Sequence, residues 1–181
     1  MRIYLLAFAL AFPFAALAQN PGGVSTGLNL WLKADASVYF DGGTTLATNG
    51  QTTTQWNDQS PSSNNLSQST LGNRPIYRTR VANFNPVLTF SKNQFLDVTA
   101  ALGIGSTSDY TYFIVFEPNS ITTGGTTDGS GDYIIDRTTG TNDLTSLKFI
   151  TGPNLLYQTR YNDGSGLGGP TKSVSAGNRY I

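Results

Sequence analysis

The sequence predicts an all-β fold, a sandwich or barrel of short antiparallel strands, on three observations. Segments rich in aromatic and β-branched residues recur along the chain, each short and bounded by Gly, Pro, Asn or Asp. No ten-residue window places its apolar residues at the i, i+3, i+4 spacing of an amphipathic helix. Charged residues are only 12% of the 181 residues, about half the usual share, a balance typical of exported all-β proteins.

The first 18 residues are predicted to be a secretory signal peptide. Arg2 gives a positive start, residues 3–17 are apolar apart from Pro13, and Ala16-Leu-Ala18 forms a cleavage site of the A-x-A type. The apolar run is shorter than the roughly 20 residues of a membrane-spanning helix. We therefore expect an exported protein with one domain over residues 19–181 and no membrane insertion after cleavage. Without any cysteine, a packed core rather than disulfides must stabilise it.

The expected strands follow in order along this domain. Leu28, Leu30 and Leu32 alternate with other residues, which predicts a strand with its leucine face in the core. The strongest candidate is 110–117, dense in aromatic and β-branched residues, which predicts a central strand buried on both faces. The Gly-Pro-Asn segment 152–154 predicts a hairpin turn. The remaining predicted strands span residues 74–80, 87–90, 132–136, 147–151, 155–161 and 172–175.

The charge balance and the missing residue types narrow the possible functions. Eleven basic residues balance eleven acidic ones, so no basic excess favours nucleic acid as a partner. The chain has no histidine, which excludes a serine triad. Glu117 is the only glutamate, and an extended strand would place it about 26 Å from Asp109, too far for a glycosidase pair of carboxylates. We therefore predict no catalytic residues and no enzymatic activity.

Four segments match a known pattern in order and spacing: Gly27-Leu-Asn-Leu-Trp-Leu-Lys-Ala-Asp-Ala36, Gln55-Trp-Asn-Asp-Gln-Ser60, Asn83-Phe-Asn-Pro-Val-Leu-Thr-Phe90 and Phe95-Leu96. They resemble laminin-G-like, concanavalin A-like domains, of the kind found near the amino terminus of surface proteins that gliding bacteria export by a type IX system. The resemblance covers most of residues 24–117. It departs from the family at Ser60-Pro-Ser-Ser-Asn-Asn65, where the family usually has a glycine-containing turn.

The resemblance implies a jelly-roll sandwich of two antiparallel sheets, exported or displayed on the surface of a Gram-negative bacterium. Family members mostly serve in adhesion or glycan recognition, so a glycan or a surface protein is the expected partner. The alternatives are a structural spacer within a larger adhesin and a degenerate glycosidase or lyase. The hydrolases of the superfamily cluster carboxylates on one strand and its lyases use His and Tyr, and this chain has neither set.

Sugar binding requires an exposed aromatic ring that stacks on a pyranose, with amides or carboxylates beside it for the hydroxyls. Trp56 with Asp58 is one candidate set, although the sequence favours a core position for Trp56 and a turn cap at Ser60 for Asp58. Tyr157 and Tyr161 beside Asn162 form the other, and a core or rim position is their alternative.

Calcium is the one metal that the composition suits, because Ca²⁺ is bound by oxygen ligands alone. Asp128 and Asp132 flank a Gly-Ser-Gly segment that is long enough to wrap an ion, and an ordinary surface loop explains the same residues. No cofactor is otherwise expected.

The last residues, Gly177-Asn-Arg-Tyr-Ile181, look like the start of a strand. An edge strand ending there would leave backbone groups of the sandwich unpaired. We therefore expect the chain to be truncated at its C-terminal end, lacking its last strands, and to continue covalently into further C-terminal domains.

Overall fold

The computed structural model describes residues 20–99, 102, 109–121, 132–138, 144–150, 154–160 and 170–181. In these ranges the chain consists of strands and loops, and its only helical segments are two three-residue 3-10 turns, η1 (Pro21–Gly23) and η2 (Leu71–Asn73). All the sheets are antiparallel, so the predicted all-β class is confirmed. The chain divides into two compact units, Met1–Leu102 and Gly103–Ile181.

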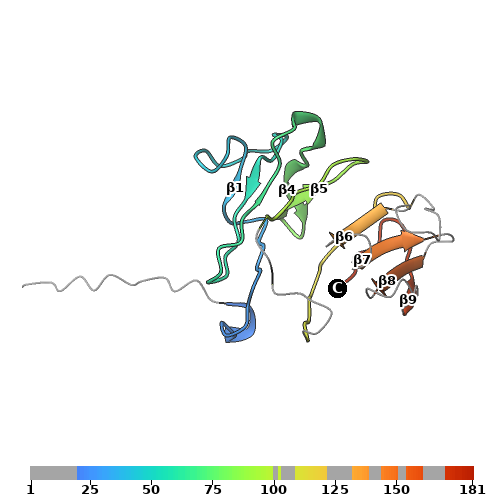
Figure 1. The fold of residues 1–181 in the computed structure, drawn as a ribbon. Helices are drawn as coiled ribbons and strands as arrows, with labels where there is room; N and C mark the ends of the chain where they lie inside the picture. Colours follow the sequence, from blue (N-terminus) through green and yellow to red (C-terminus); the bar gives the residue numbers. More distant parts are fainter. Residues whose placement is uncertain are drawn as a thin grey trace, which may run out of the picture. The chain divides into compact units, whose positions relative to one another are not determined.

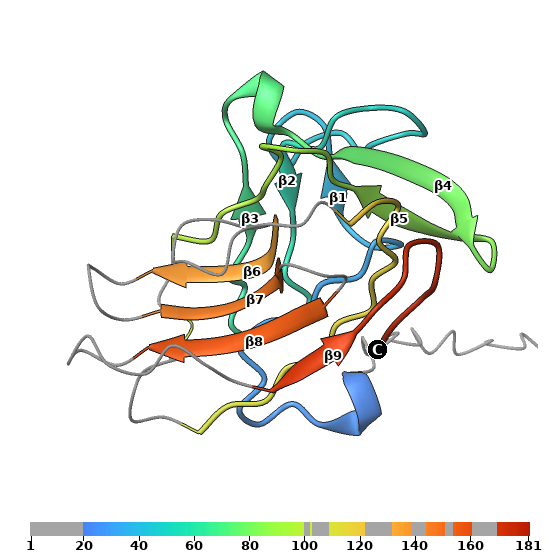
Figure 2. The same ribbon diagram turned by 90° about the vertical axis from the view of Figure 1, so that its right-hand side faces the viewer.

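The first unit holds one three-stranded sheet and one hairpin (Figure 2). The sheet has the order β1 (Val38–Tyr39), β2 (Gln55–Trp56), β3 (Leu66–Ser67). Each of these strands is only two residues long, so none shows the period-two pattern from which strands are predicted. Val38 and Ala47 are the buried apolar side chains, and Thr53 and Pro75 lie buried with them.

The hairpin of the first unit pairs β4 (Ile76–Ala82) with β5 (Asn85–Thr89). These strands confirm the two predicted at 74–80 and 87–90, shifted by a few residues. The pairing is regular from Ile76 to Arg78 and then becomes irregular before Ala82. The tip of the hairpin lies away from β1, β2 and β3 in both views of the ribbon (Figures 1 and 2).

The second unit is a four-stranded antiparallel sheet in sequence order (Figure 1). Its strands are β6 (Asp132–Thr138), β7 (Leu144–Ile150), β8 (Asn154–Arg160) and β9 (Thr171–Ser173). All four coincide with predicted strands. β7 and β8 pair antiparallel up to Ile150 opposite Asn154, and residues 152–153 of the predicted turn lie outside the described part.

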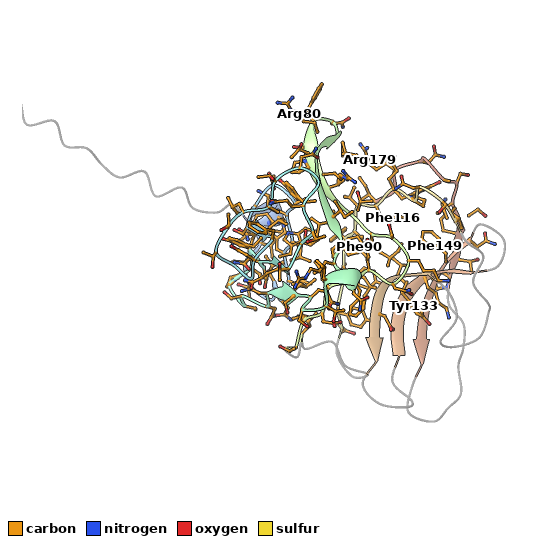
Figure 3. The ribbon with its side chains drawn as sticks, turned by 90° about the horizontal axis from the view of Figure 1, so that it is seen from above. Arg80, Phe90, Phe116, Tyr133, Phe149 and Arg179 are labelled. Atoms are coloured by element: carbon orange, nitrogen blue, oxygen red, sulfur yellow. The ribbon has the colours of Figure 1, made fainter. Side chains whose placement is uncertain are left out.

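Aromatic packing forms the core of the second unit. Leu147, Phe149 and Val174 are buried. Phe116 meets Phe149 edge to face with ring centroids 6.2 Å apart, and stacks on Tyr180 at 5.5 Å (Figure 3). Lys148 is also fully buried on the central strand β7, and its ammonium group lies 5.4 Å from the centre of the Tyr133 ring. In the described part of the chain no hydrogen bond engages the Lys148 Nζ, so the face of the Tyr133 ring is the contact that the structure shows for it.

Two predicted strands are wrong. Residues 28–33 form no strand, because the Trp31 N–H donates to the Asp58 carboxylate instead of to a neighbouring strand. In the described part of the chain, residues 110–117 form no strand, and Phe116 makes an isolated bridge with Tyr180. The Phe113 side chain is 87% exposed and Val115 is 64% exposed, so this segment is not a central strand buried on both faces.

Candidate functional site

The Asp58 carboxylate organises a turn in the first unit. Its Oδ1 accepts hydrogen bonds from the Trp31 and Ser60 backbone N–H groups at 2.7 and 2.8 Å. Its Oδ2 accepts from the Ser60 hydroxyl at 2.6 Å and from the Asn64 N–H at 2.8 Å. The predicted cap at Ser60 is therefore confirmed. Both oxygens are engaged inside the protein, and no lone pair is left directed at a sugar hydroxyl.

The same contacts decide the charge state of Asp58, which is only 7% exposed. Burial on its own raises the pKa of this carboxyl. The hydrogen bonds from Ser60, Trp31 and Asn64 outweigh that effect and hold the pKa below its ordinary value of 3.8. Asp58 is therefore an ionised structural group at neutral pH. We name residues 58–65, together with Trp31, the Asp58 turn.

Trp56 is half-buried in β2, between Val38 of β1 and Leu66 of β3 in the register of the sheet. Its indole Nε1–H donates to the Lys33 carbonyl at 2.8 Å. The Lys33 ammonium lies 5.5 Å from the centre of the Trp31 ring and pairs with Asp35 at 3.5 Å. The Trp56 ring thus has its polar atom bonded inside the unit, and this position matches the core alternative better than an exposed platform.

The other predicted site residues are placed only in part. Tyr157 lies in β8, opposite Leu147 of β7. Tyr161 and Asn162 lie outside the described residues, and so does Asp128. Asp132 is the first residue of β6. In the described ranges no three His, Cys, Asp or Glu side chains gather as metal ligands. The tyrosine and calcium sites therefore stay predictions.

The structure adds a surface that the sequence did not indicate, at the end of the β4–β5 hairpin. Ala82 pairs with Asn85, so Asn83 and Phe84 form a two-residue turn. Both have positive φ, 49° and 65°, the conformation of a type I′ turn. Phe84 takes a position where glycine is usual, and its side chain is 88% exposed. We name residues 78–85 the hairpin tip.

A bulge shapes the arginine side of the hairpin tip. Three residues, 79–81, stand between the paired Arg78 and Ala82, whereas only Pro86 stands between their partners Val87 and Asn85. Proline has no N–H to donate to the ladder, so the pairing breaks opposite Pro86. Arg80 adopts a positive φ of 59° in this bulge, and its side chain extends from the outer end of the hairpin (Figure 3). Bulges of this kind redirect side chains.

Most polar side chains of the hairpin tip make no hydrogen bond within the described part of the chain. The Asn85 Nδ2 donates to the Asn83 carbonyl at 3.3 Å, and no hydrogen bond engages the Asn83 amide in the described part of the chain. Within the same ranges neither Arg78 nor Arg80 has an ion pair or a side-chain hydrogen bond. In the sequence, the Asn83–Phe84 pair between two predicted strands could have indicated this tight turn, because Asn tolerates the left-handed region.

The single glutamate of the chain lies in the second unit. Glu117 is exposed and accepts from Arg179 Nη2 at 2.9 Å, the geometry of a surface ion pair. The hairpin tip offers an aromatic face, amides and guanidinium groups, which are suited to binding. In the ranges described, no helix is long and apolar enough to cross a bilayer.

Comparison of the chain with protein-family models, with curated proteins and with solved structures finds no match to any of them. The functional assignment therefore depends on the geometry of the chain itself.

Proposed function

We propose that this chain is an exported, non-catalytic domain that recognises carbohydrate through the hairpin tip. The laminin-G-like resemblance and a jelly-roll sandwich belong to the same proposal. The observation that carries it is Phe84, whose ring is 88% exposed at the end of a hairpin and flanked by two asparagines. A flat aromatic ring stacks on the apolar face of a pyranose, and amides hydrogen-bond its hydroxyls.

The backbone of Phe84 gives independent support. A bulky residue at φ of 65° costs about 1–2 kcal/mol relative to a right-handed conformation. Glycine would remove this cost, since it adopts positive φ freely. Local strain of this kind clusters at binding and catalytic sites. An exposed ring in a strained position makes few contacts within its own chain, and this arrangement is expected where a ligand covers the ring.

Binding of the purified chain to a panel of immobilised polysaccharides tests this function. The unchanged chain should bind at least one of them, and Phe84→Ala should weaken that binding about 10-fold through loss of the stacked ring. Phe95→Ala is the matched control, because Phe95 is an exposed phenylalanine of the same unit outside the hairpin. Circular dichroism of each variant checks that the fold is kept.

Two results would contradict the proposal. Absence of binding to every polysaccharide would favour the structural spacer instead. Equal losses in Phe84→Ala and Phe95→Ala would show that the hairpin tip is not the site.

The non-catalytic part has its own test. Prolonged incubation with the bound polysaccharide should release no reducing ends, since Glu117 faces Arg179 rather than a second carboxylate. Release that disappears in Glu117→Gln would make the domain a hydrolase.

A further inference from the structure

The hairpin tip lies in a stretch of one-sided charge. Between Asp58 and Asp97 the chain has no acidic residue and four basic ones, Arg74, Arg78, Arg80 and Lys92. The whole chain is balanced, with eleven residues of each sign, so this segment departs from the composition of the rest. A local cluster of one sign attracts ligands of the opposite sign.

The arginines of this stretch differ in what they contact. The Arg74 guanidinium donates to the Gln68 and Ser69 carbonyls at 3.0 and 2.7 Å, which fixes it as a structural group. Arg78 and Arg80 are exposed and make no such bond in the described ranges. Two uncommitted guanidinium groups therefore stand within six residues of Phe84, on the same hairpin.

The backbone at Arg80 supports a role for its side chain. Its positive φ of 59° and the bulge opposite Pro86 give β4 an irregular path at this residue. Arg80 is thus the third non-glycine residue of the hairpin tip with positive φ, beside Asn83 and Phe84, and it adds to the strain already present at Phe84. Arg80 and Phe84, the two large residues at these strained backbone positions, are both exposed.

We propose that the hairpin tip is specific for acidic polysaccharides, whose carboxylates pair with Arg78 and Arg80 while a sugar ring stacks on Phe84. The planar guanidinium matches a carboxylate with two parallel hydrogen bonds. Asn83 and Asn85 beside the ring suit a hydroxylated polymer better than lipid acyl chains, which offer no hydrogen-bond partner. This specificity rests on the proposed carbohydrate recognition. The experiment therefore has to distinguish a failure of acidic specificity from a failure of carbohydrate recognition.

The experiment compares two forms of one polymer, polygalacturonate and its methyl ester, which has the same sugar backbone without the charges. The purified chain should bind polygalacturonate at least about 5-fold more tightly than the ester, as two exposed ion pairs allow. Raising the salt from about 50 to about 200 mM should weaken binding to polygalacturonate several-fold and leave binding to the ester unchanged.

The double variant Arg78→Gln with Arg80→Gln removes both charges and keeps long polar side chains. It should lose the preference for polygalacturonate while still binding the ester like the unchanged chain. Lys172→Gln, at an exposed cation on β9, is the matched control and should keep the full preference. Phe84→Ala should weaken binding to both polymers.

Several outcomes would overturn the inference. Equal binding of the two polymers would disprove acidic specificity and leave carbohydrate recognition standing. A preference unchanged in the double arginine variant would place the charge recognition elsewhere. Binding to phosphatidylglycerol vesicles as tight as to polygalacturonate would make the tip a membrane-binding element. Binding to neither polymer, nor to any other glycan of the panel, would overturn the proposed function as well.

Discussion

The Asp58 turn and the hairpin tip are both polar turns of the first unit, yet their polar groups are used in opposite ways. At Asp58 a single carboxylate accepts four hydrogen bonds from three residues, and the group is nearly inaccessible. At the hairpin tip the guanidinium groups and the Asn83 amide face solvent without partners in the described part of the chain. Satisfied polar groups build a fold, whereas exposed and unsatisfied ones remain available to a ligand.

The Asp58 turn and the hairpin tip also differ in which residues adopt positive φ. In the Asp58 turn, the hydrogen bonds of Asp58 hold the chain in place and the strain of Ser63, at φ 53°, occurs in a small residue. At the hairpin tip, Phe84 and Arg80 hold positive φ, and the Arg80 side chain makes no internal hydrogen bond in the described ranges. The two turns should therefore respond differently to mutation: the first in stability, the second in binding.

The largest expected effect is the loss of stability in Asp58→Ala. Removal of the carboxylate leaves the Trp31, Ser60 and Asn64 N–H groups without their acceptor, which should lower the free energy of unfolding by about 3 kcal/mol. Urea denaturation measures this change. Asp41→Ala is the control, because the Asp41 carboxylate accepts from the Thr44 and Thr45 N–H groups on an exposed loop. If both variants lose the same stability, Asp58 does not hold the turn as described.

The ionised state of Asp58 makes part of the stability depend on pH. Its pKa is lower in the folded chain than the ordinary 3.8, so its contribution is complete above about pH 5 and is lost as the pH falls below 3.8 toward the folded pKa. Asp58→Asn should lose this part of the acid dependence. Thermal melts between neutral and acidic pH check it, and identical acid profiles in the two proteins would contradict it.

The strands of the second unit could be predicted from the sequence because three of them are long. β7 and β8 each have seven residues, enough for β-branched and aromatic residues to show the pattern. A prediction from strand propensity is wrong where residues of high propensity do not join a sheet. Residues 110–117 have high strand propensity, yet in the described part of the chain they form no strand and show one isolated bridge, between Phe116 and Tyr180. Propensity reports the local conformation and carries no information about the partner.

The site was harder to predict than the fold. The sequence pointed to Trp56 and Asp58 because an aromatic beside a carboxylate is a usual sugar-binding set. The structure shows both with their polar atoms engaged, Trp56 at the Lys33 carbonyl and Asp58 at its turn. Phe84 gave no comparable signal, since exposure and a left-handed backbone are properties of the folded hairpin. The asymmetry of charge from 59 to 96 was readable in the sequence and would have drawn attention to this hairpin.

Strain at the hairpin tip can be separated from its aromatic ring by two substitutions. Phe84→Gly should raise the free energy of unfolding by about 1 kcal/mol relative to Phe84→Ala, because glycine adopts positive φ without the cost that alanine keeps. Both variants lack the ring and should bind glycan equally weakly. Urea denaturation and glycan binding are measured on the same samples. Equal stability of the two variants would mean that position 84 is not strained.

The smallest effect is expected at the ion pair of the second unit. Arg179 and Glu117 are both exposed, so the pair contributes little after solvent screening, and Arg179→Ala should cost at most about 0.5 kcal/mol. A double-mutant cycle with Glu117→Ala measures their coupling by urea denaturation, and glycan binding should be unchanged in all three variants. A guanidinium engaged in this way differs from Arg78 and Arg80 by having a partner, which leaves it unavailable to a ligand. Weakened glycan binding in Arg179→Ala would therefore contradict the assignment of recognition to the hairpin tip alone.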